Sequence, residues 1–339
     1  MVALRQQVFR KSEHGTPDEL AAYVERIFFD APWAAADLPS LVYEDTGGSV
    51  AGFLGVVVRR FRLRGQPLRA AVATQLMVRP GTTGLPGLHL ARAFVDGPHD
   101  LAFSDTANDA ARVLWERVGG VVALPYSLFW TMPLRPARYG ASHLAQGVAG
   151  RALAYLTRPV CAMIDAFHTL PPAPPGDAME PLTISRHLPE MDQVLQAWEL
   201  CPQYDAETLA RLLDHLERKR HYGELEKVLV RDRRGRAIGW FVYCRNSGGV
   251  GQVVQIGCRP NDYPRILALL ARHARSRRIV ALAGRLDPAA SAALAQRGCV
   301  FTRQGPWMLV RSNHPQVLEA ICRGSGLLSR LEGEWWLGF

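Results

Sequence analysis

Apolar residues between positions 40 and 118 recur first at strand spacing and then at helix spacing. Two apolar runs between Ser40 and Val58 flank the turn residues Asp45-Thr-Gly-Gly48, and a third run, Leu68–Val78, follows. Runs of this length around glycine-bearing turns predict an antiparallel meander. Beyond Val78 the period lengthens, which predicts a loop at 80–87, a helix at 88–95, a strand at 100–104 and a helix at 108–118.

The amino-terminal segment predicts a short strand and a capped helix. The apolar run Ala3–Phe9 is interpreted as the strand. Thr16-Pro-Asp-Glu19 combines an N-cap residue, a proline and two acids in the first turn, so a helix is expected from there to about Phe28.

The second half of the chain repeats this order of elements. A proline-rich connector, Leu170–Asp177, can form neither a helix nor a central strand, and a helical stretch (141–167) precedes it. After it come a strand at 181–185, helices at 188–200 and 206–217, a hairpin at 227–244, then strand 251–258, helix 263–275, strand 279–283 and helix 288–297. We therefore predict a duplicated α/β (α+β) fold with domains at 1–170 and 179–339 and a linker at 171–178. Trp335 and Trp336 are expected to pack as the last strand of the second sheet.

The segment Val78-Arg-Pro-Gly-Thr-Thr-Gly-Leu-Pro-Gly-Leu88 carries the first candidate chemistry. A glycine-bearing loop between a strand and a helix can turn backbone N–H groups towards a phosphate, and the helix N-terminus adds partial positive charge. A tight structural turn is an equally good interpretation of this loop when it is considered alone.

A second motif follows about twenty residues later and supports the phosphate-loop interpretation. Taken together, Val78-Arg-Pro80, Gly84, Asn108, Ala111 and Gly119 resemble the GNAT acyltransferase superfamily, in which V-x-P and Q/R-x-x-G-x-G/A precede N-x-x-A-x-x-x-Y-x-x-x-G-F. Trp115 stands at the usual tyrosine position, Gly81 replaces arginine or glutamine, and Pro86 replaces glycine or alanine. Proline has no N–H to offer a phosphate, and tryptophan cannot protonate a thiolate.

The resemblance implies two tandem GNAT-like domains, each a mostly antiparallel mixed sheet flanked by helices. It also implies direct attack of a small amine acceptor on the thioester of acetyl-CoA or another acyl-CoA, with the coenzyme bound in the first domain. The implied coenzyme-binding residues are Leu76, Val78, Gly81, Thr82, Thr83, Gly84, Leu85, Gly87, Leu88, Asn108 and Trp115.

Candidates for the general base are few. Asp105 and Glu44 are the acids nearest the expected cleft, although a turn or capping role suits each of them better. Tyr126 could line the acceptor pocket or could be a core aromatic.

The second half lacks both motifs, because Arg259-Pro-Asn-Asp-Tyr-Pro264 has no glycine and Arg285-Leu-Asp-Pro-Ala289 has no asparagine. Paired GNAT folds with a single working site occur in N-myristoyltransferases and Fem peptidyltransferases, so a silent second domain is expected by analogy. A non-catalytic GNAT-like binding module is a further alternative.

Composition leaves these interpretations open. The chain has 339 residues, 48% of them hydrophobic, with no apolar stretch long enough to span a membrane and no signal-peptide pattern, which favours a cytoplasmic protein. Its six cysteines are scattered, so neither a metal site nor a disulfide framework is expected. The net charge of +9 suits an anionic ligand, and the arginine runs at 231–236 and 272–278 keep an aminoacyl-tRNA-dependent transferase as the alternative. An arginine-rich composition explains the same charge.

Overall fold

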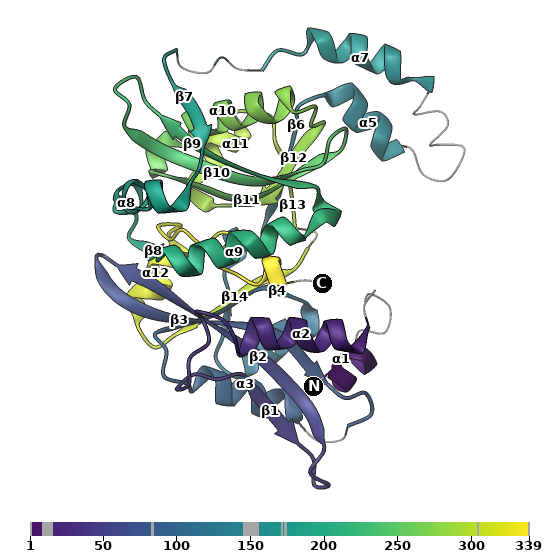
Figure 1. Cartoon of the computed structure of the whole chain (residues 1–339), viewed down its shortest axis with the longest axis vertical. Coiled ribbons are helices and arrows are strands. Elements are labelled where there is room, and N and C mark those ends of the chain that lie inside the picture. The colour runs from purple at the N-terminus through teal and green to yellow at the C-terminus, as the bar shows by residue number, and fades with distance from the viewer. Residues whose placement is uncertain are drawn as a thin grey trace. The chain divides into compact units, whose positions relative to one another are not determined.

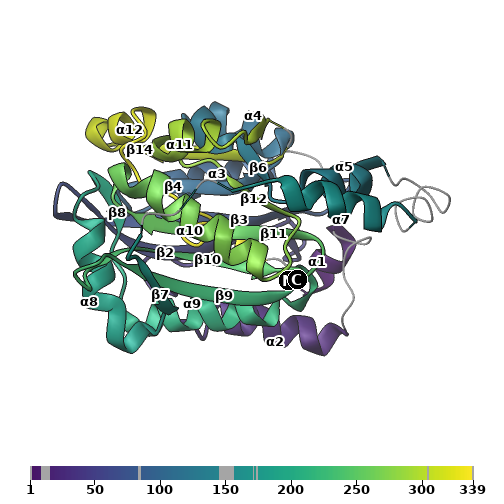
Figure 2. The same cartoon turned by 90° about the horizontal axis from the view of Figure 1, so that it is seen from above.

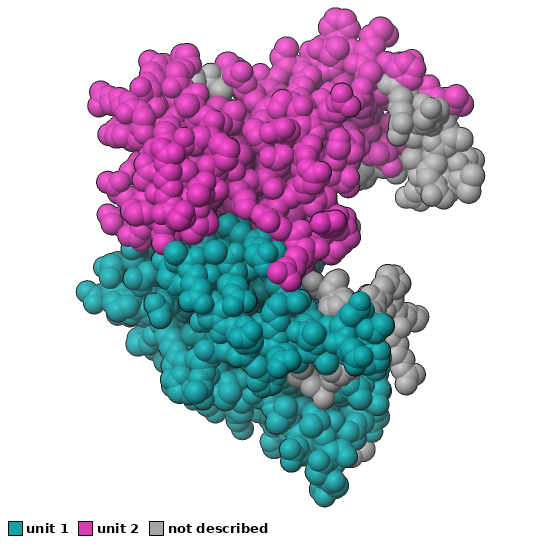
Figure 3. All heavy atoms as spheres, viewed as in Figure 1, with its two compact units in different colours: residues 1–127, 198–215, 305–339 teal, residues 128–197, 216–304 magenta. Residues whose placement is uncertain are grey.

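The chain folds into two compact units whose segments alternate along the sequence (Figure 3). The computed structural model describes residues 2–8, 16–82, 85–144, 156–170, 172, 175–303 and 305–337. The first unit combines residues 1–127, 198–215 and 305–339, and the second combines residues 128–197 and 216–304. This division differs from the single boundary that the sequence predicts at 171–178.

The first unit is built on one mixed sheet (Figure 1). Its elements are α1 (Val2–Val8), α2 (Pro17–Phe28), β1 (Leu41–Glu44), β2 (Val50–Leu63), β3 (Gln66–Val78), α3 (Pro86–Val95), β4 (Leu101–Ala107), α4 (Asp109–Arg117), β5 (Val121–Val122), η1 (Leu124–Ser127), β8 (Leu200–Pro202), β14 (Trp307–Ser312), α12 (Pro315–Cys322) and η5 (Trp335–Leu337). The strand order is β1-β2-β3-β4-β14-β5, with β8 paired to β2. Only β3 and β4 are paired in parallel among the strand pairs described for this sheet.

The second unit repeats this plan. Its elements are β6 (Phe129–Pro133), α5 (Pro136–Leu144), α7 (Arg158–Phe167), β7 (Ala178–Pro181), α8 (Ile184–Leu195), η2 (Arg220–Tyr222), β9 (Glu224–Arg231), β10 (Ala237–Arg245), β11 (Val250–Cys258), η3 (Pro260–Asp262), α10 (Tyr263–Ser276), β12 (Ala281–Arg285), η4 (Pro288–Ala290), α11 (Ser291–Ala295) and β13 (Val300–Thr302). The strand order is β13-β6-β12-β11-β10-β9-β7, and β11 and β12 form the parallel pair. Helix α9 (Ala206–Arg218) begins in the first unit and ends in the second. The predicted fold class, two mixed α/β sheets in tandem, is confirmed.

Each sheet takes strands from the other half of the sequence, β8 and β14 in the first sheet and β6 in the second. Strand β14 lies between β4 and β5, although some 200 residues separate it from them. Strand β6 occupies the equivalent place between β12 and β13. This reciprocal exchange is what a duplicated fold would produce if each copy gave its last strand to the other. Strand periodicity can predict that a strand exists but not which strand it pairs with, so the exchange could not be predicted from the sequence.

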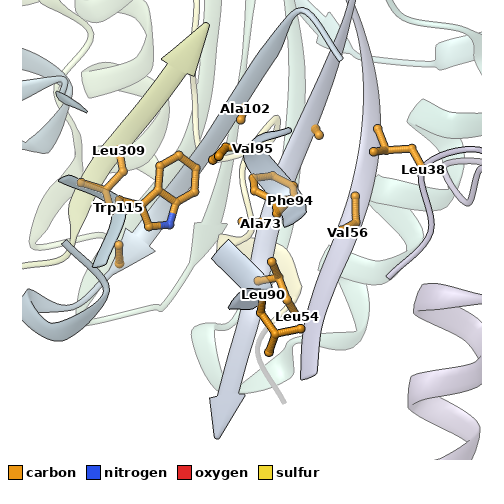
Figure 4. Packing of buried hydrophobic residues seen from close by; sticks show 12 residues of the cluster. Leu38, Leu54, Val56, Ala73, Leu90, Phe94, Val95, Ala102, Trp115 and Leu309 are labelled. Atoms are coloured by element: carbon orange, nitrogen blue, oxygen red, sulfur yellow. The ribbon is translucent and has the colours of Figure 1, made fainter. Parts of the chain in front are cut away.

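Opposite faces of the first sheet are covered by different helices (Figure 2). Alternating residues of β2 point to opposite sides. The ring of Phe53 packs edge-on against the ring of Phe28 in α2, with 5.4 Å between the ring centres. Leu54 instead joins the buried cluster that includes Leu90 of α3 and Trp115 of α4 (Figure 4). No described helix in either unit is long and apolar enough to cross a membrane.

Local signals predicted many of these elements but not β5, β6, β8, β13, β14 or α12, and three of the predictions were wrong. The capping box of Thr16 and Glu19 is present at the start of α2. Residues 3–8 of the segment predicted as strand Ala3–Phe9 are instead part of helix α1, because seven residues are too few to distinguish strand spacing from helix spacing, and Phe9 lies outside the described residues. The strand expected at 181–185 lies earlier in the sequence, because β7 spans Ala178–Pro181 and helix α8 already begins at Ile184. The tryptophan pair expected in the second sheet lies in η5 of the first unit, where Trp336 is fully buried.

The exchange predicts that neither half of the chain folds alone. A fragment of residues 1–170 lacks β14, so β4 would lose the antiparallel partner that joins it to β5. We expect this fragment to show no cooperative thermal unfolding, whereas the full chain cleaved within the connector after folding should keep its transition. Circular dichroism melting checks this, and a cooperative transition in the isolated fragment would show that the exchange is dispensable.

Candidate active site

Strands β3 and β4 pair only at their beginnings. Their parallel register runs from Ala70↔Leu101 to Val72↔Phe103 and stops there, although β3 continues to Val78 and β4 to Ala107. The outer edges remain paired, β3 to β2 and β4 to β14. The two inner edges therefore diverge and leave backbone N–H and C=O groups facing a gap, where an extended ligand can add hydrogen bonds as a strand would.

A bulge lies on β3 where it leaves β4. Phe53 pairs with Met77 and Gly55 with Thr74, so Leu54 opposes both Gln75 and Leu76. Gln75 has a φ of +50°, which is unusual for a residue other than glycine. Such a bulge takes a residue out of the ladder and redirects its backbone groups.

A partly buried network holds the bulge in place. The guanidinium of Arg5 in α1 donates a hydrogen bond to the Gln75 side-chain oxygen. The Gln75 side-chain nitrogen donates to the hydroxyl of Tyr23 at 3.1 Å, and that hydroxyl donates to the carbonyl of Leu337. Burial raises the pKa of Tyr23, which keeps its hydroxyl protonated as a donor. The network ties α1, α2 and η5 to the bulge.

The diverging strands form the wall of a cavity of about 500 Å³. Its lining residues come from the separated ends of β3 and β4, from α1 and α4, and from the carboxy-terminal segment: Arg5, Val8, Leu54, Ala73, Thr74, Gln75, Leu76, Ser104, Thr106, Ala107, Asn108, Ala111, Trp115, Glu334, Trp335 and Leu337. The volume is typical of small-molecule sites.

Glu334 is the acid that faces this cavity. Its Oε1 accepts hydrogen bonds from the Ser104 hydroxyl at 2.5 Å and from the Thr106 backbone N–H at 3.2 Å. Burial raises the pKa of Glu334, and the nearby charge of Asp105 raises it further, while the hydrogen bonds from Ser104, Thr74 and Thr106 oppose the shift. A carboxyl group with a raised pKa in a cavity is a candidate general base.

Asp105, predicted as a weak candidate base, lies behind Glu334. Its side chain is 2% exposed, and its Oδ1 accepts the backbone N–H of Glu334 at 2.5 Å. Gly333 passes so close that an added Cβ would lie 2.1 Å from the Asp105 carboxyl carbon. Asp105 therefore anchors the segment that presents Glu334, and it is not among the residues that line the cavity.

Three of the residues predicted to bind the coenzyme line the cavity, namely Leu76, Asn108 and Trp115. The Asn108 side chain caps α4 by accepting the Ala111 backbone N–H at 2.8 Å. Trp115 is 4% exposed and packs against Phe94 at 5.8 Å between ring centres. Trp115 thus serves as core and as cavity wall at once, and coenzyme contact by these residues stays a prediction.

The predicted phosphate loop begins where β3 ends. Gly81 adopts a φ of +79°, and Arg79 is fixed by Asp45 at 2.9 Å and by the Val50 carbonyl at 2.7 Å. Leu85 is the N-cap residue of α3, and its side chain makes no capping hydrogen bond. The first backbone N–H groups of this helix therefore have no acceptor on the N-cap side chain. Val78, Thr82, Gly87 and Leu88 belong to the same strand end, loop and helix start, while Thr83 and Gly84 lie outside the described residues.

Two other predicted residues lie elsewhere. Glu44 is exposed at the end of β1, opposite Val50, and does not line the cavity. Tyr126 is fully buried and donates its hydroxyl to the Gly326 carbonyl at 2.7 Å, so it is a core aromatic with no free hydroxyl for an acceptor. The core interpretation of Tyr126 is therefore the correct one.

Sequence reasoning missed Glu334, Gln75 and Arg5. Glu334 had one available signal, since an acid directly before the apolar segment Trp335-Trp-Leu337 needs a partner if that segment is buried. The positive φ of Gln75 has no signal in the sequence, because glutamine does not favour that conformation.

In the second unit, buried side chains connect the corresponding strand ends. The hydroxyl of Tyr263, the first residue of α10, donates to Asp287, which follows β12. Tyr263 is 1% exposed. Helix α10 follows β11, the first strand of the parallel pair. The bulky side chain of Tyr263 thus fixes the start of this helix, whereas the first unit has a glycine-bearing loop at the corresponding place.

Several solved structures share this double arrangement. A GCN5-related N-acetyltransferase from Anabaena variabilis matches with a TM-score of 0.58 and 13% identity, covering 93% of this chain and 70% of that one. A GCN5-related N-acetyltransferase from Kribbella flavida gives 0.55 and 12%, covering 92% and 68%. N-myristoyltransferase of Saccharomyces cerevisiae with bound myristoyl-CoA gives 0.50 and 12%, covering 92% and 75%. Neither a protein-family model nor a curated protein matches the sequence.

The chain has a tandem GNAT fold. Within that fold, the diverging parallel pair of the first unit is the feature that creates the cavity. Among the described residues, no group of histidine, cysteine, aspartate and glutamate side chains could hold a metal ion.

The raised pKa of Glu334 predicts a pH-dependent stability. The folded chain binds this proton more tightly than the unfolded chain, so the stabilisation is complete below the unfolded pKa and is lost as pH rises through the folded pKa. Glu334→Gln removes the titration, so the unfolding free energy of this variant should rise relative to that of the wild type as the pH increases above the ordinary pKa of glutamate. Urea unfolding at several pH values measures this difference.

Glu25→Gln, on the exposed surface of α2, provides the control and should differ from the wild type by a small amount at every pH. If the unfolding free energies of Glu334→Gln and the wild type differed by the same amount at every pH, the pKa of the Glu334 carboxyl group would not be shifted in the folded chain.

Proposed function

We propose that this chain transfers the acyl group of an acyl-coenzyme A to a small amine. The observation that carries the proposal is the cavity between the separated ends of β3 and β4, with an anchored carboxyl group on its wall. The likeness to N-acetyltransferase and N-myristoyltransferase structures supports the fold on which such a site is built.

The cavity suits the extended arm of the coenzyme. The free inner edges of β3 and β4 offer alternating donors and acceptors to the amide groups of that arm, and Leu54, Leu76 and Trp115 provide apolar walls. The backbone of residues 81–88 and the start of α3 would hold the pyrophosphate, as the sequence motif implies. Pro86 contributes no donor there, so the remaining N–H groups must suffice.

The transfer itself needs alignment and a proton acceptor. In this proposal the amine nitrogen attacks the thioester carbonyl carbon, the C–S bond breaks, and the coenzyme leaves as a thiolate. Glu334 accepts the proton that the amine loses. A backbone N–H of the bulge at Gln75–Leu76 meets the negative charge that develops on the carbonyl oxygen. Trp115 offers no acidic hydroxyl, so solvent protonates the thiolate.

Several of the arginines on which the aminoacyl-tRNA alternative rests have partners within the fold. Arg231 binds Glu180 and Glu190, and Arg236 binds Asp232. Arg275 donates to the backbone carbonyls of Asp165 and His168. Arginines in such pairs offer less charge to a phosphate backbone, so the acyl-CoA proposal is favoured.

Filling the cavity should block the coenzyme. Ala111 on α4 lines the cavity, whereas Ala110, its neighbour on the same helix, is exposed. Ala111→Leu should weaken acetyl-CoA binding about tenfold or more because its side chain would occupy the cavity, and Ala110→Leu should change binding little. Isothermal titration calorimetry with acetyl-CoA compares them. Equal affinities for both variants would place the coenzyme elsewhere.

Asn108 combines a cap with a predicted coenzyme contact, and two substitutions separate these roles. Asn108→Ala should lower the unfolding free energy by about 1 kcal/mol because the cap is lost. Asn108→Asp retains a capping oxygen but adds a negative charge, so it should preserve stability while weakening acetyl-CoA binding. Thermal melts and calorimetry give the two readouts. Unchanged binding in both variants would limit Asn108 to the cap.

A further inference from the structure

Arg59 of β2 lies between two tryptophan rings. Its guanidinium carbon is 5.2 Å from the ring centre of Trp33 and 5.1 Å from that of Trp336. The rings are fixed by their own hydrogen bonds, from Trp33 to the Ile27 carbonyl at 2.8 Å and from Trp336 to the Gly333 carbonyl at 2.6 Å. The aromatic rings stabilise the cation but accept none of its in-plane hydrogen bonds.

The donors of Arg59 are poorly used. The side chain is 6% exposed, and its Nη1 makes one long contact of 3.5 Å to the Val58 carbonyl. Its Nε and Nη2 are buried and have no hydrogen-bond partner among the described residues. Burial lowers the pKa of Arg59 to about 10, against the opposing effect of Glu332, so the group is charged at neutral pH. Buried charged donors without acceptors are costly.

This guanidinium lines a second cavity of the first unit, with a volume of about 540 Å³. About half of the residues in its walls are apolar, including Pro32, Trp33, Val58, Leu68, Pro202 and Leu331. A cavity that combines an apolar wall with a buried cation suits an anion that carries an apolar body.

Glu332 and Asp205, two of the three acids that line this cavity, already have donors, and the third, Asp100, accepts the backbone N–H of Arg69 at 2.7 Å. Glu332 accepts hydrogen bonds from the Tyr204 hydroxyl and from Ser329, through its backbone N–H at 2.7 Å and its hydroxyl at 2.6 Å. Asp205 accepts the backbone N–H and the hydroxyl of Thr208 at 2.8 Å and 2.9 Å. Neither Glu332 nor Asp205 has a hydrogen bond to Arg59 among those described, so the charge of the arginine is balanced only at a distance.

We propose that this cavity binds a small carboxylate ligand with an apolar or aromatic body, whose carboxylate pairs with the guanidinium of Arg59. A guanidinium and a carboxylate form charge-assisted hydrogen bonds, which are stronger than those between neutral groups. The rings of Trp33 and Trp336 hold the guanidinium in one orientation, so little rotational freedom is lost on binding.

The carboxylate site is separate from the acyl-CoA cavity. Leu54 lines the acyl-CoA cavity and Val58 lines the carboxylate site, four residues further along β2, which corresponds to about 13 Å. The carboxy-terminal segment borders both, since Glu332 lines the carboxylate site and Glu334 lines the acyl-CoA cavity. The proposal does not depend on acyl transfer.

Titration of the full chain with acetate, benzoate and indole-3-acetate tests the site. Calorimetry and tryptophan fluorescence should show saturable benzoate or indole-3-acetate binding, with benzamide weaker by about tenfold or more because it lacks the charge. Arg59→Met should lose about tenfold or more in affinity. Arg92→Gln is the control, because Arg92 is exposed on α3 and lines neither cavity, and it should stay within about twofold of the wild type.

Stability separates a binding role from a structural one. If Arg59 serves a ligand, Arg59→Met removes a buried charge and should unfold at the same or a higher urea concentration than the wild type. A less stable Arg59→Met that binds the carboxylates as the wild type does would assign Arg59 to packing and overturn the proposal. So would the absence of carboxylate binding up to the millimolar range, or tighter binding of inorganic phosphate. A separate acetyl-CoA titration reports on the acyl-CoA cavity, so the two proposals can fail independently.

Discussion

The separation of β3 from β4 after Val72 and Phe103 is the constraint on which the candidate site depends. Two parallel strands that stay paired leave no free edge, whereas two that diverge expose backbone donors and acceptors that a ligand must satisfy. The outer partners, β2 and β14, hold each strand while the inner edges part. The bulge at Gln75 and the helix cap at Asn108 both lie at the open end of that gap.

The carboxy-terminal segment completes what the strands begin. It reaches the first unit because β14 is paired to β4, and Asp105 then anchors the backbone at Glu334. Close packing of Gly333 on Asp105 leaves no room for a side chain there. Residues more than 220 positions apart in the sequence thus line the same cavities. Arg59 and Glu332 line one cavity, and Ser104 and Glu334 line the other. Duplication and exchange of strands provide the connection that a single domain of this kind would lack.

Local chemistry explains what the sequence could predict. The cap at Thr16, the turn at Asp45 and the motif from Val78 to Asn108 each depend on neighbours within a few residues, and the structure has an element at each place. The strand exchange and Glu334 depend on contacts between distant segments, which periodicity does not encode. Tyr126 and Asp105 show the same limit, because their burial is set by Gly326 and Gly333 near the other end of the chain.

Hydrogen–deuterium exchange with and without acetyl-CoA tests the central claim most directly, because it reports on the backbone groups that the gap exposes. We predict slower exchange at residues 73–78 and 104–111 when acetyl-CoA is bound, with little change at residues 250–263 of the second unit. Protection confined to the second unit, or no protection in the separated ends of β3 and β4, would contradict the account.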